Sequence, residues 1–231
     1  MTCELCVMVP AAEAGAALET AKRLGWKGLC LLADSKESRA AKEAVTKARV
    51  KGIEVSIGLL LEPKSKNELK RRVSASRKNC GLIAVKPNSP ELSRSAAETR
   101  GVDLLIGWES VGQSPTERVI DYVTIKIAAG NGVAIAFSLQ PLLAAYDRSR
   151  ASVMSKYIET ARFVRKYKAG FALTSGAVSA WDLRSPSELA AFGKVLGFNG
   201  REARQALSGG LLEENRKRLS GKWIMPGVEV E

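Results

Sequence analysis

The stretch that decides the class of fold is residues 170–197, GFALTSGAVSAWDLRSPSELAAFGKVLG. Its first part, residues 171–174, is a short apolar run that leads into small residues, which is typical of a buried strand ending in a tight loop. Its second part has the signals of a helix start, because Ser185 is a good N-cap, Pro186 suits the first helical position and Glu188 completes a capping box. The stretch therefore predicts a strand, a loop and a helix in succession.

Arg184 lies one residue before this helix cap. A guanidinium beside a glycine-containing loop and a helix N-terminus is well placed to hold a phosphate group. The alternative is a structural role in which Arg184 pairs with a carboxylate such as Asp182. The sequence leaves both roles open.

The rest of the chain repeats the alternation of strand and helix. The further expected strands are residues 5–9, 28–33, 53–61, 82–86, 102–107 and 133–139. The expected helices are 13–24, 38–50, 67–77, 90–100, 121–129, 152–167 and, after 185, 201–207 and 211–219, followed by an extended tail at 228–230. The segment 121–129 also fits a strand, and only its position between two strands favours a helix.

This alternation predicts parallel βα units. With seven strands and no clear eighth, we expect an α/β fold of the TIM-barrel-like (β/α) type with irregular closure, forming a single domain over residues 1–231. A nucleotide-binding sheet is disfavoured, because the chain has neither a G-x-G-x-x-G nor a P-loop motif.

Composition narrows the function. The chain has 231 residues, 45% of them hydrophobic, a net charge of +12 and no histidine. The absence of histidine excludes Ser-His-Asp and Cys-His nucleophilic machinery and His-bearing metal sites. There is no apolar run near the ~20 residues of a spanning helix, and the start lacks the features of a signal peptide, so we expect a cytoplasmic protein.

The four cysteines are Cys3, Cys6, Cys30 and Cys80. Cys3-x-x-Cys6 suggests a metal or redox pair. In a regular strand, however, residues three apart point to opposite faces, so these two thiols are not expected to share a metal ion. We expect buried or partly buried free thiols, and no metal or cofactor bound by the protein.

The positive charge is concentrated in two segments, 64–86 and 148–168. A run of charge is often only a solvated helix face, but these two runs carry nearly the whole net charge, which predicts binding to a polyanion. The few aromatic residues give no sign of base-specific readout, so phosphate contacts to folded RNA are expected. The candidate RNA-binding residues are Arg184, Lys86, Arg71, Arg72, Lys78, Lys168, Arg162 and Lys166.

Four short pieces of sequence carry a resemblance to the ribonuclease P protein component 3 family of archaea and eukaryotes. They are Thr174-Ser175-Gly176-Ala177, Leu183-Arg184-Ser185-Pro186, Val195-Leu196-Gly197, and Ala203 followed by Ala206-Leu207-Ser208. Weaker likeness extends over most of the chain. The resemblance implies a TIM-barrel-like protein that binds the catalytic RNA of ribonuclease P and a small partner subunit.

The same resemblance implies a ribonucleoprotein endonuclease, a hydrolase of tRNA processing that cuts precursor tRNA to form its mature 5′ end. Magnesium is then held by the RNA, and the isolated chain is expected to have no catalytic activity.

Two other functions remain open on the residues. A small barrel enzyme acting on a phosphorylated molecule would use the carboxyl ends of the strands, which offer Asp34, Glu62, Lys86, Glu109 and Ser175. Lys86 is then the candidate Schiff-base lysine. A general chaperone of structured RNA is the third alternative.

Overall fold

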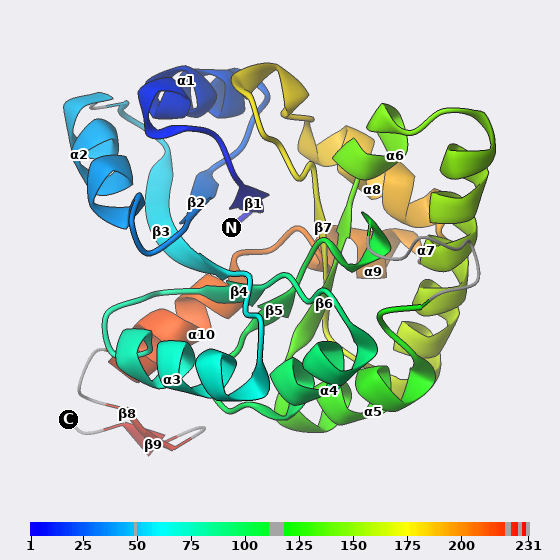
Figure 1. Ribbon diagram of the computed structural model, residues 1–231. Helices are drawn as coiled ribbons and strands as arrows, with labels where there is room; N and C mark the ends of the chain where they lie inside the picture. The colour runs from blue at the N-terminus through cyan, green and yellow to red at the C-terminus, as the bar shows by residue number, and fades with distance from the viewer. Residues whose placement is uncertain (49, 111–117, 220–222, 226–227, 230–231) are drawn as a thin grey trace.

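The computed structural model describes residues 1–48, 50–110, 118–219, 223–225 and 228–229. Seven parallel strands follow one another in chain order and curve around a common centre (Figure 1). Their bounds are β1 Cys3–Val7, β2 Gly28–Ala33, β3 Glu54–Leu61, β4 Ile83–Val85, β5 Leu104–Leu105, β6 Ala134–Ser138 and β7 Phe171–Thr174. The expected TIM-barrel-like fold is thus confirmed.

Helices surround these strands. Their bounds are α1 Ala14–Arg23, α2 Ser38–Ala48, α3 Lys66–Ser76, α4 Pro90–Glu98, α5 Tyr122–Asn131, α6 Gln140–Ala144, α7 Asp147–Tyr167, α8 Pro186–Val195, α9 Gly200–Gln205 and α10 Gly210–Leu219. Short 3-10 helices span Ala11–Glu13, Trp108–Ser110 and Ala180–Asp182. A separate antiparallel pair, β8 Trp223–Met225 with β9 Val228–Glu229, lies near the C-terminus.

Burial on both faces of the sheet explains why the strands read as continuous apolar runs. In β6, Ala134 and Ala136 face the interior of the barrel, whereas Ile135 and Phe137 pack against the helices outside. The interior of a barrel of this size is just wide enough for side chains to fill it. Here these are mainly small or branched side chains. The larger aromatic residues therefore lie in the outer layer.

The seam between β1 and β7 is closed by a segment that comes late in the chain. The backbone N–H of Cys3 donates to the carbonyl of Leu207 at 2.9 Å, and that of Leu173 donates to Ala206 at 3.3 Å. Further along, the N–H of Met8 donates directly to Ala177 at 2.7 Å. Among the described residues no eighth parallel strand occupies this position. The expected irregular closure is therefore made by the connection from α9 to α10.

The Glu4 carboxylate joins the two sides of the seam from within the barrel. It is fully buried and accepts hydrogen bonds from the Thr174 hydroxyl, from the N–H of Ser175 at 3.2 Å and from the N–H of Cys6 at 3.4 Å. Burial raises the pKa of Glu4 to about 7, although these hydrogen bonds act in the opposite direction.

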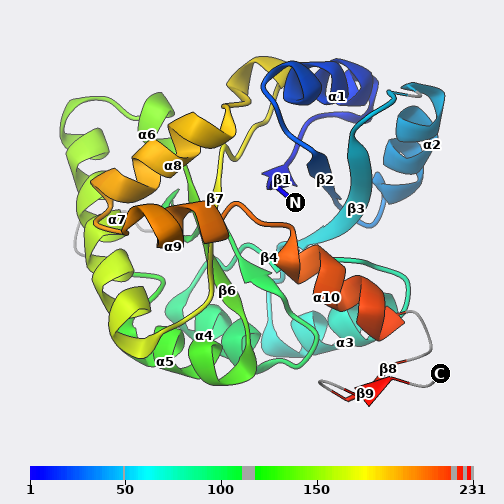
Figure 2. The same cartoon turned by 180° about the vertical axis from the view of Figure 1, so that it is seen from behind.

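The last long helix covers the end of the barrel at which the strands begin. Leu211 and Leu212 of α10 pack against the interior residues, and Figure 2 shows α9 and α10 in front of the strands. We call this end the amino-end face and the opposite end the carboxyl-end face. Covering the amino end with α10 leaves the carboxyl-end loops to surround the other opening.

Most of the expected elements are present, and 121–129 lies within a helix, α5. The sequence did not predict α6 or β8. The helix expected at 152–167 begins five residues earlier, at Asp147, and the helix expected at 67–77 spans Lys66–Ser76, with Ser65 as its N-cap. Of the expected tail, 228–229 forms β9 and residue 230 lies outside the described residues.

The orientation expected for the first two cysteines was wrong. One extra residue in β1 shifts its register against β2 between Glu4 and Val7, and this bulge brings both Cys3 and Cys6 into the barrel interior, near Cys30. These three thiols are free and buried, whereas Cys80 is half-buried. Burial raises the pKa of Cys3 to about 12. In the described part of the chain, no three His, Cys, Asp or Glu residues are arranged to hold a metal ion.

Candidate nucleic-acid interface

The turns that lead from a helix into the next strand carry exposed cations. In a parallel barrel all such turns meet at the end where the strands begin. We call five residues of these turns, which lie far apart in the sequence, the turn cations: Lys27, Lys51, Lys78, Arg100 and Lys168. In the described parts of these turns the acidic residue is Asp103. It is buried and forms an ion pair with Arg77 at 2.6 Å. The turns themselves are therefore strongly positive, while the amino-end face also carries Glu54, which is paired with Arg216, and the exposed Glu213 and Glu214 of α10.

The carboxyl-end loops are different, because they mix both signs of charge. Glu13, Asp34, Glu62 and Asp182 lie there. Lys86 does so too, and its Nζ lies 3.1 Å from Oε1 of Glu62 in a half-exposed ion pair. Lys86 is therefore not among the turn cations, although it was expected to bind RNA.

Glu109 is a buried carboxylate at the carboxyl end of β5. The residue is only 2% exposed. Within the described residues, neither of its carboxylate oxygens has a hydrogen-bond partner. The Tyr157 hydroxyl nearby donates to the carbonyl of Ser138 at 2.6 Å. Burial raises the pKa of Glu109 to about 7, partly offset by its own backbone N–H, the nearby Tyr157 hydroxyl and the positive charges of Lys86 and Lys156.

The C-terminal part of α7 brings several of the expected RNA-binding residues together. Arg162, Lys166 and Lys168 are exposed there, and Arg165 joins them with its Nη1 bonded to the carbonyl of Gly197 at 3.0 Å. Lys156, in the same charged segment of the sequence, is instead 8% exposed, and its Nζ donates to the Glu109 carbonyl at 3.4 Å.

The basic segment around α3 is only partly available. Arg71 and Lys78 are exposed, but Arg72 is half-buried and lies 3.3 Å from Glu68. Arg77 donates to Gly101 and Asp103 and is structural. Helices α4 and α5 lie between α3 and α7 around the barrel, so the two basic segments do not form one helical surface (Figure 1).

Arg184 directly precedes Ser185, the N-cap of α8, as expected, and it does not pair with Asp182. The loop after β7 turns back along α1, and the carbonyl of Arg184 accepts a hydrogen bond from Trp26 in the α1–β2 turn at 2.8 Å. Its guanidinium Nη1 donates to the carbonyls of Trp181 and Leu183, each at 2.9 Å. Asp182 instead caps its own 3-10 helix. The Arg184 guanidinium is thus held by backbone carbonyls at the N-terminus of α8.

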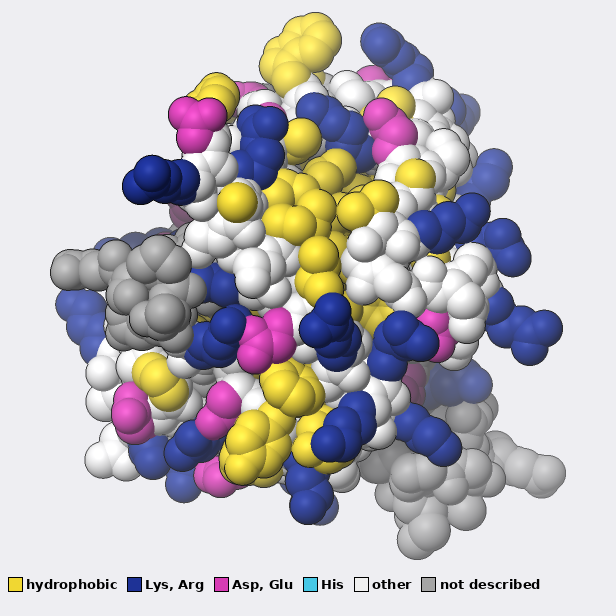
Figure 3. Space-filling view, turned by 90° about the vertical axis from the view of Figure 1, so that its right-hand side faces the viewer, with side chains coloured by type: hydrophobic (Ala, Val, Ile, Leu, Met, Phe, Trp, Pro, Cys, Tyr) yellow, Lys and Arg dark blue, Asp and Glu magenta, His cyan; other side chains and the backbone are white. Residues whose placement is uncertain are grey.

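The side of the molecule that carries α7 is not uniformly basic. Figure 3 shows an apolar strip across this side, flanked by Lys and Arg side chains. Exposed apolar residues of α6 and α8 include Leu143 and Val195, the latter 62% exposed. This strip is unsuited to phosphate, so the basic surface continues around the amino end rather than across α6 and α8.

Sequence reasoning missed Lys27, Lys51 and Arg100, because each lies outside the two basic segments. The signal that identifies them is their place directly before a predicted strand. Among the tryptophans, Trp26 and Trp108 are buried, whereas Trp181 is 88% exposed.

A family model described as RNase P subunit p30 matches residues 1–219 of the chain. The chain belongs to this family. Its p30 relatives include the ribonuclease P protein component 3 of Methanosarcina mazei, 31% identical over 210 residues that cover 90% of this chain and 85% of that protein. The corresponding protein of Thermococcus kodakarensis is 33% identical over 178 residues, or 77% of each chain.

Solved structures confirm the fold of this p30 member. A chain in the cryo-EM structure of archaeal ribonuclease P with mature tRNA superposes with a TM-score of 0.79 at 19% identity, covering 98% of this chain and 96% of that one. A histidinol phosphate phosphatase of Lactococcus lactis gives a TM-score of 0.54 at 10% identity, covering 85% and 92%. In the described part of the chain, no helix is both long and apolar enough to cross a membrane.

Proposed function

We propose that the chain is the RNA-binding p30 subunit of ribonuclease P, and that it binds the RNA of this complex through the turn cations of its amino-end face. Its partners are the ribonuclease P RNA and the other protein subunits, a small one among them, and precursor tRNA is the substrate of the complex. The observation that carries the binding mode is the gathering of exposed cations in the turns of the amino end, where the acidic residue of the described turns, Asp103, is buried and paired.

The chemistry of the complex then belongs to its RNA. Hydrolysis of the phosphodiester uses magnesium held by RNA phosphates, and the protein contributes neither nucleophile nor metal ligand. The turn cations neutralise RNA phosphates and so favour the compact, active RNA fold. The complex works in the cytoplasm. The chain has no histidine, which is consistent with this division of labour.

The small barrel enzyme is the weaker function. Family membership favours the ribonuclease P subunit. The carboxyl-end residues that an enzyme would use also include few free groups, because Lys86 is paired with Glu62. Glu109 is enclosed behind Tyr157 and Lys156 rather than open to a substrate.

Binding to the ribonuclease P RNA is expected to weaken steeply with salt. If about five phosphates are neutralised, log K falls against log salt with a slope of roughly −3.5 to −4.5. Filter binding over a range of potassium chloride concentrations measures this slope. Lys168→Gly should reduce its magnitude by about 1, whereas Lys36→Ala, which removes an exposed cation of the carboxyl-end face, should leave it unchanged. A flat titration would exclude the turn cations as the contact surface.

Replacing Arg184 tests the residue that the sequence singled out. Arg184→Ala is expected to impair assembly of the ribonucleoprotein more than Arg71→Ala, because backbone carbonyls fix the Arg184 guanidinium whereas Arg71 extends from an exposed helix face. Arg184→Lys should recover only part of the loss, since an ammonium cannot hold a phosphate in the same forked manner.

Thermal unfolding of the free protein separates contact from structure at Arg184. An unchanged unfolding midpoint with weaker assembly supports phosphate contact. A large drop in the midpoint, with the remaining folded protein binding RNA normally, would make Arg184 only a support for its loop.

A further inference from the structure

The amino-end face contains a cavity beside the turn cation Lys168. Its volume is about 450 Å³, within the ~300–1,000 Å³ that small-molecule sites usually have. It is lined by the C-terminal end of α7, the starts of β6 and β7, α9, and the segment that closes the barrel seam. The cavity therefore exists because a connecting segment, and not an eighth βα unit, fills this side of the barrel.

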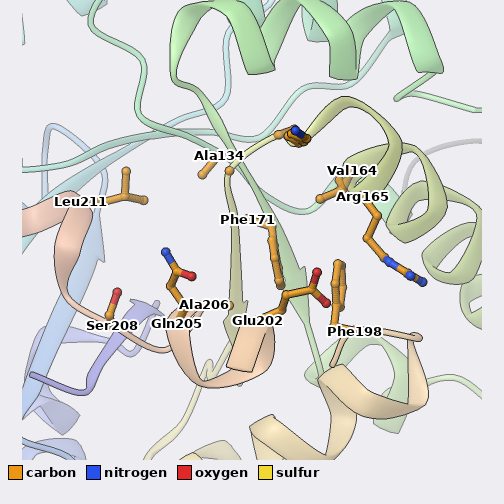
Figure 4. A pocket seen from close by; sticks show the side chains of 13 residues that line it. Ala134, Val164, Arg165, Phe171, Phe198, Glu202, Gln205, Ala206, Ser208 and Leu211 are labelled. Atoms are coloured by element: carbon orange, nitrogen blue, oxygen red, sulfur yellow. The ribbon is translucent and has the colours of Figure 1, made fainter. Parts of the chain in front are cut away.

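One wall of the cavity is aromatic. Phe171 and Phe198 stack with their ring centroids 3.9 Å apart and their planes 13° from parallel. Figure 4 shows both rings edge-on, with Phe198 on one side of Phe171 and Gln205 across the cavity on the other. Phe171 thus presents one flat face to the cavity, and a third planar ring can extend the stack.

The opposite wall carries polar groups. Gln205 and Ser208 lie across the gap from Phe171, and Leu211 lies beyond them (Figure 4). An amide and a hydroxyl can each donate and accept a hydrogen bond, which suits the edge of a nucleobase. Glu202 also lines the cavity, with its carboxylate already accepting from the N–H of Asn199 at 2.7 Å.

The rim of the cavity carries positive charge. Lys168 lines it and is exposed. Arg165 adds positive charge nearby, with its guanidinium beyond Phe198 and bonded to the Gly197 carbonyl (Figure 4). An apolar side chain from a protein would need no such cations, whereas a nucleotide brings a phosphate with its base. Stacking of unpaired bases on aromatic rings, next to a basic groove, is a general way to bind single-stranded RNA.

We propose that this cavity binds one unpaired nucleotide of RNA, with its base stacked on Phe171 and its phosphate held by Lys168. This inference rests on the proposed function, because it assumes that the amino-end face contacts RNA. It adds a base contact to a surface whose charges alone suggest phosphate contacts only.

The test compares two short single-stranded RNA probes with the same number of phosphates. One probe is abasic at every position, and the other carries a single adenine at its centre. The full chain is expected to bind the adenine probe about tenfold more tightly, the size of effect that stacking of one base produces. Equal affinity for the two probes overturns the proposal and leaves an apolar side chain of a protein partner as the better occupant.

Three variants locate the nucleotide. Phe171→Leu keeps an apolar side chain without a flat face and should abolish the preference for adenine, and Gln205→Ala, which alters only an exposed side chain, should reduce it. Lys168→Gly should weaken both probes equally. This variant is not expected to disturb folding, because Lys168 has a φ of 54°, a backbone conformation that glycine adopts more readily.

Trp181→Ala is the matched control, since Trp181 is a highly exposed aromatic residue outside the cavity. Loss of the preference in Trp181→Ala, with its retention in Phe171→Leu, would contradict the proposal. Failure of the unaltered chain to bind the ribonuclease P RNA would instead count against the proposed function. If the unaltered chain binds that RNA but shows no preference for the adenine probe, only the proposal that the cavity binds a base is rejected.

Discussion

Glu4→Ala is expected to lower the unfolding midpoint of the free protein by about 10 °C. The Glu4 carboxylate accepts hydrogen bonds from Thr174, Ser175 and Cys6, and it connects β1 to the end of β7. Alanine leaves these buried donors without an acceptor and opens a cavity, which together cost about 3–5 kcal/mol. A loss of that size corresponds to roughly 2–4 °C per kcal/mol in a domain of this length.

Differential scanning calorimetry measures the effect, with Glu19→Ala on the exposed face of α1 as the control. Glu4→Gln should lose less, because one amide oxygen can still accept hydrogen bonds. A midpoint for Glu4→Ala within 2–3 °C of the parent protein, a change of only about 1 kcal/mol, would show that the 206–208 segment alone closes the barrel.

Glu109→Gln is expected to make the protein more stable at alkaline pH. Burial raises the pKa of Glu109 from 4.5 to about 7, so between these values the folded state keeps a proton that the unfolded state has released. The free energy of unfolding therefore falls as pH rises through this window, by up to about 3 kcal/mol for this group. Glutamine stays neutral and removes that loss.

Urea unfolding at the two ends of the window measures this effect. Glu4 has the same direction of shift, so part of the pH dependence should remain in the variant. Glu98→Gln, on the exposed side of α4, is the control and should follow the parent protein. If Glu109→Gln is less stable than the parent above pH 7, the carboxylate has a favourable partner when ionised.

The elements of the barrel were predictable because their signals are local. The capping box of Ser185 and Glu188 marks the start of α8, and Gly197, with a φ of 93°, follows its end as expected. Apolar runs identified all seven barrel strands, since both faces of a parallel sheet are buried. These patterns lie within a few residues of one another and need no knowledge of the tertiary structure.

The closure of the barrel was not predictable in this way. The segment 206–208 follows a helix and has no strand pattern, yet it pairs with β1, two hundred residues earlier in the chain. The bulge that turns Cys6 inward also depends on a contact between separate segments, because it is a shift in the pairing of β1 with β2. Contacts between distant segments decide both features.

The candidate site was predicted in part. Lys78 and Lys168 lie on the amino-end face, and the α7 residues Arg162 and Lys166 are exposed as expected. Lys86 lies at the other end of the barrel, and counting charge along the sequence missed Lys27, Lys51 and Arg100. A barrel gathers one residue from each turn, so its charged surface follows the topology rather than the local density of Lys and Arg.

Capture of the tagged chain from its native cells tests the central claim most directly. The chain should recover the ribonuclease P RNA as its main structured RNA, and Lys27→Ala, Lys78→Ala and Lys168→Gly combined should lose it while remaining folded. Recovery of no ribonuclease P RNA above the untagged control, or of unrelated RNAs in equal amounts, would contradict the account.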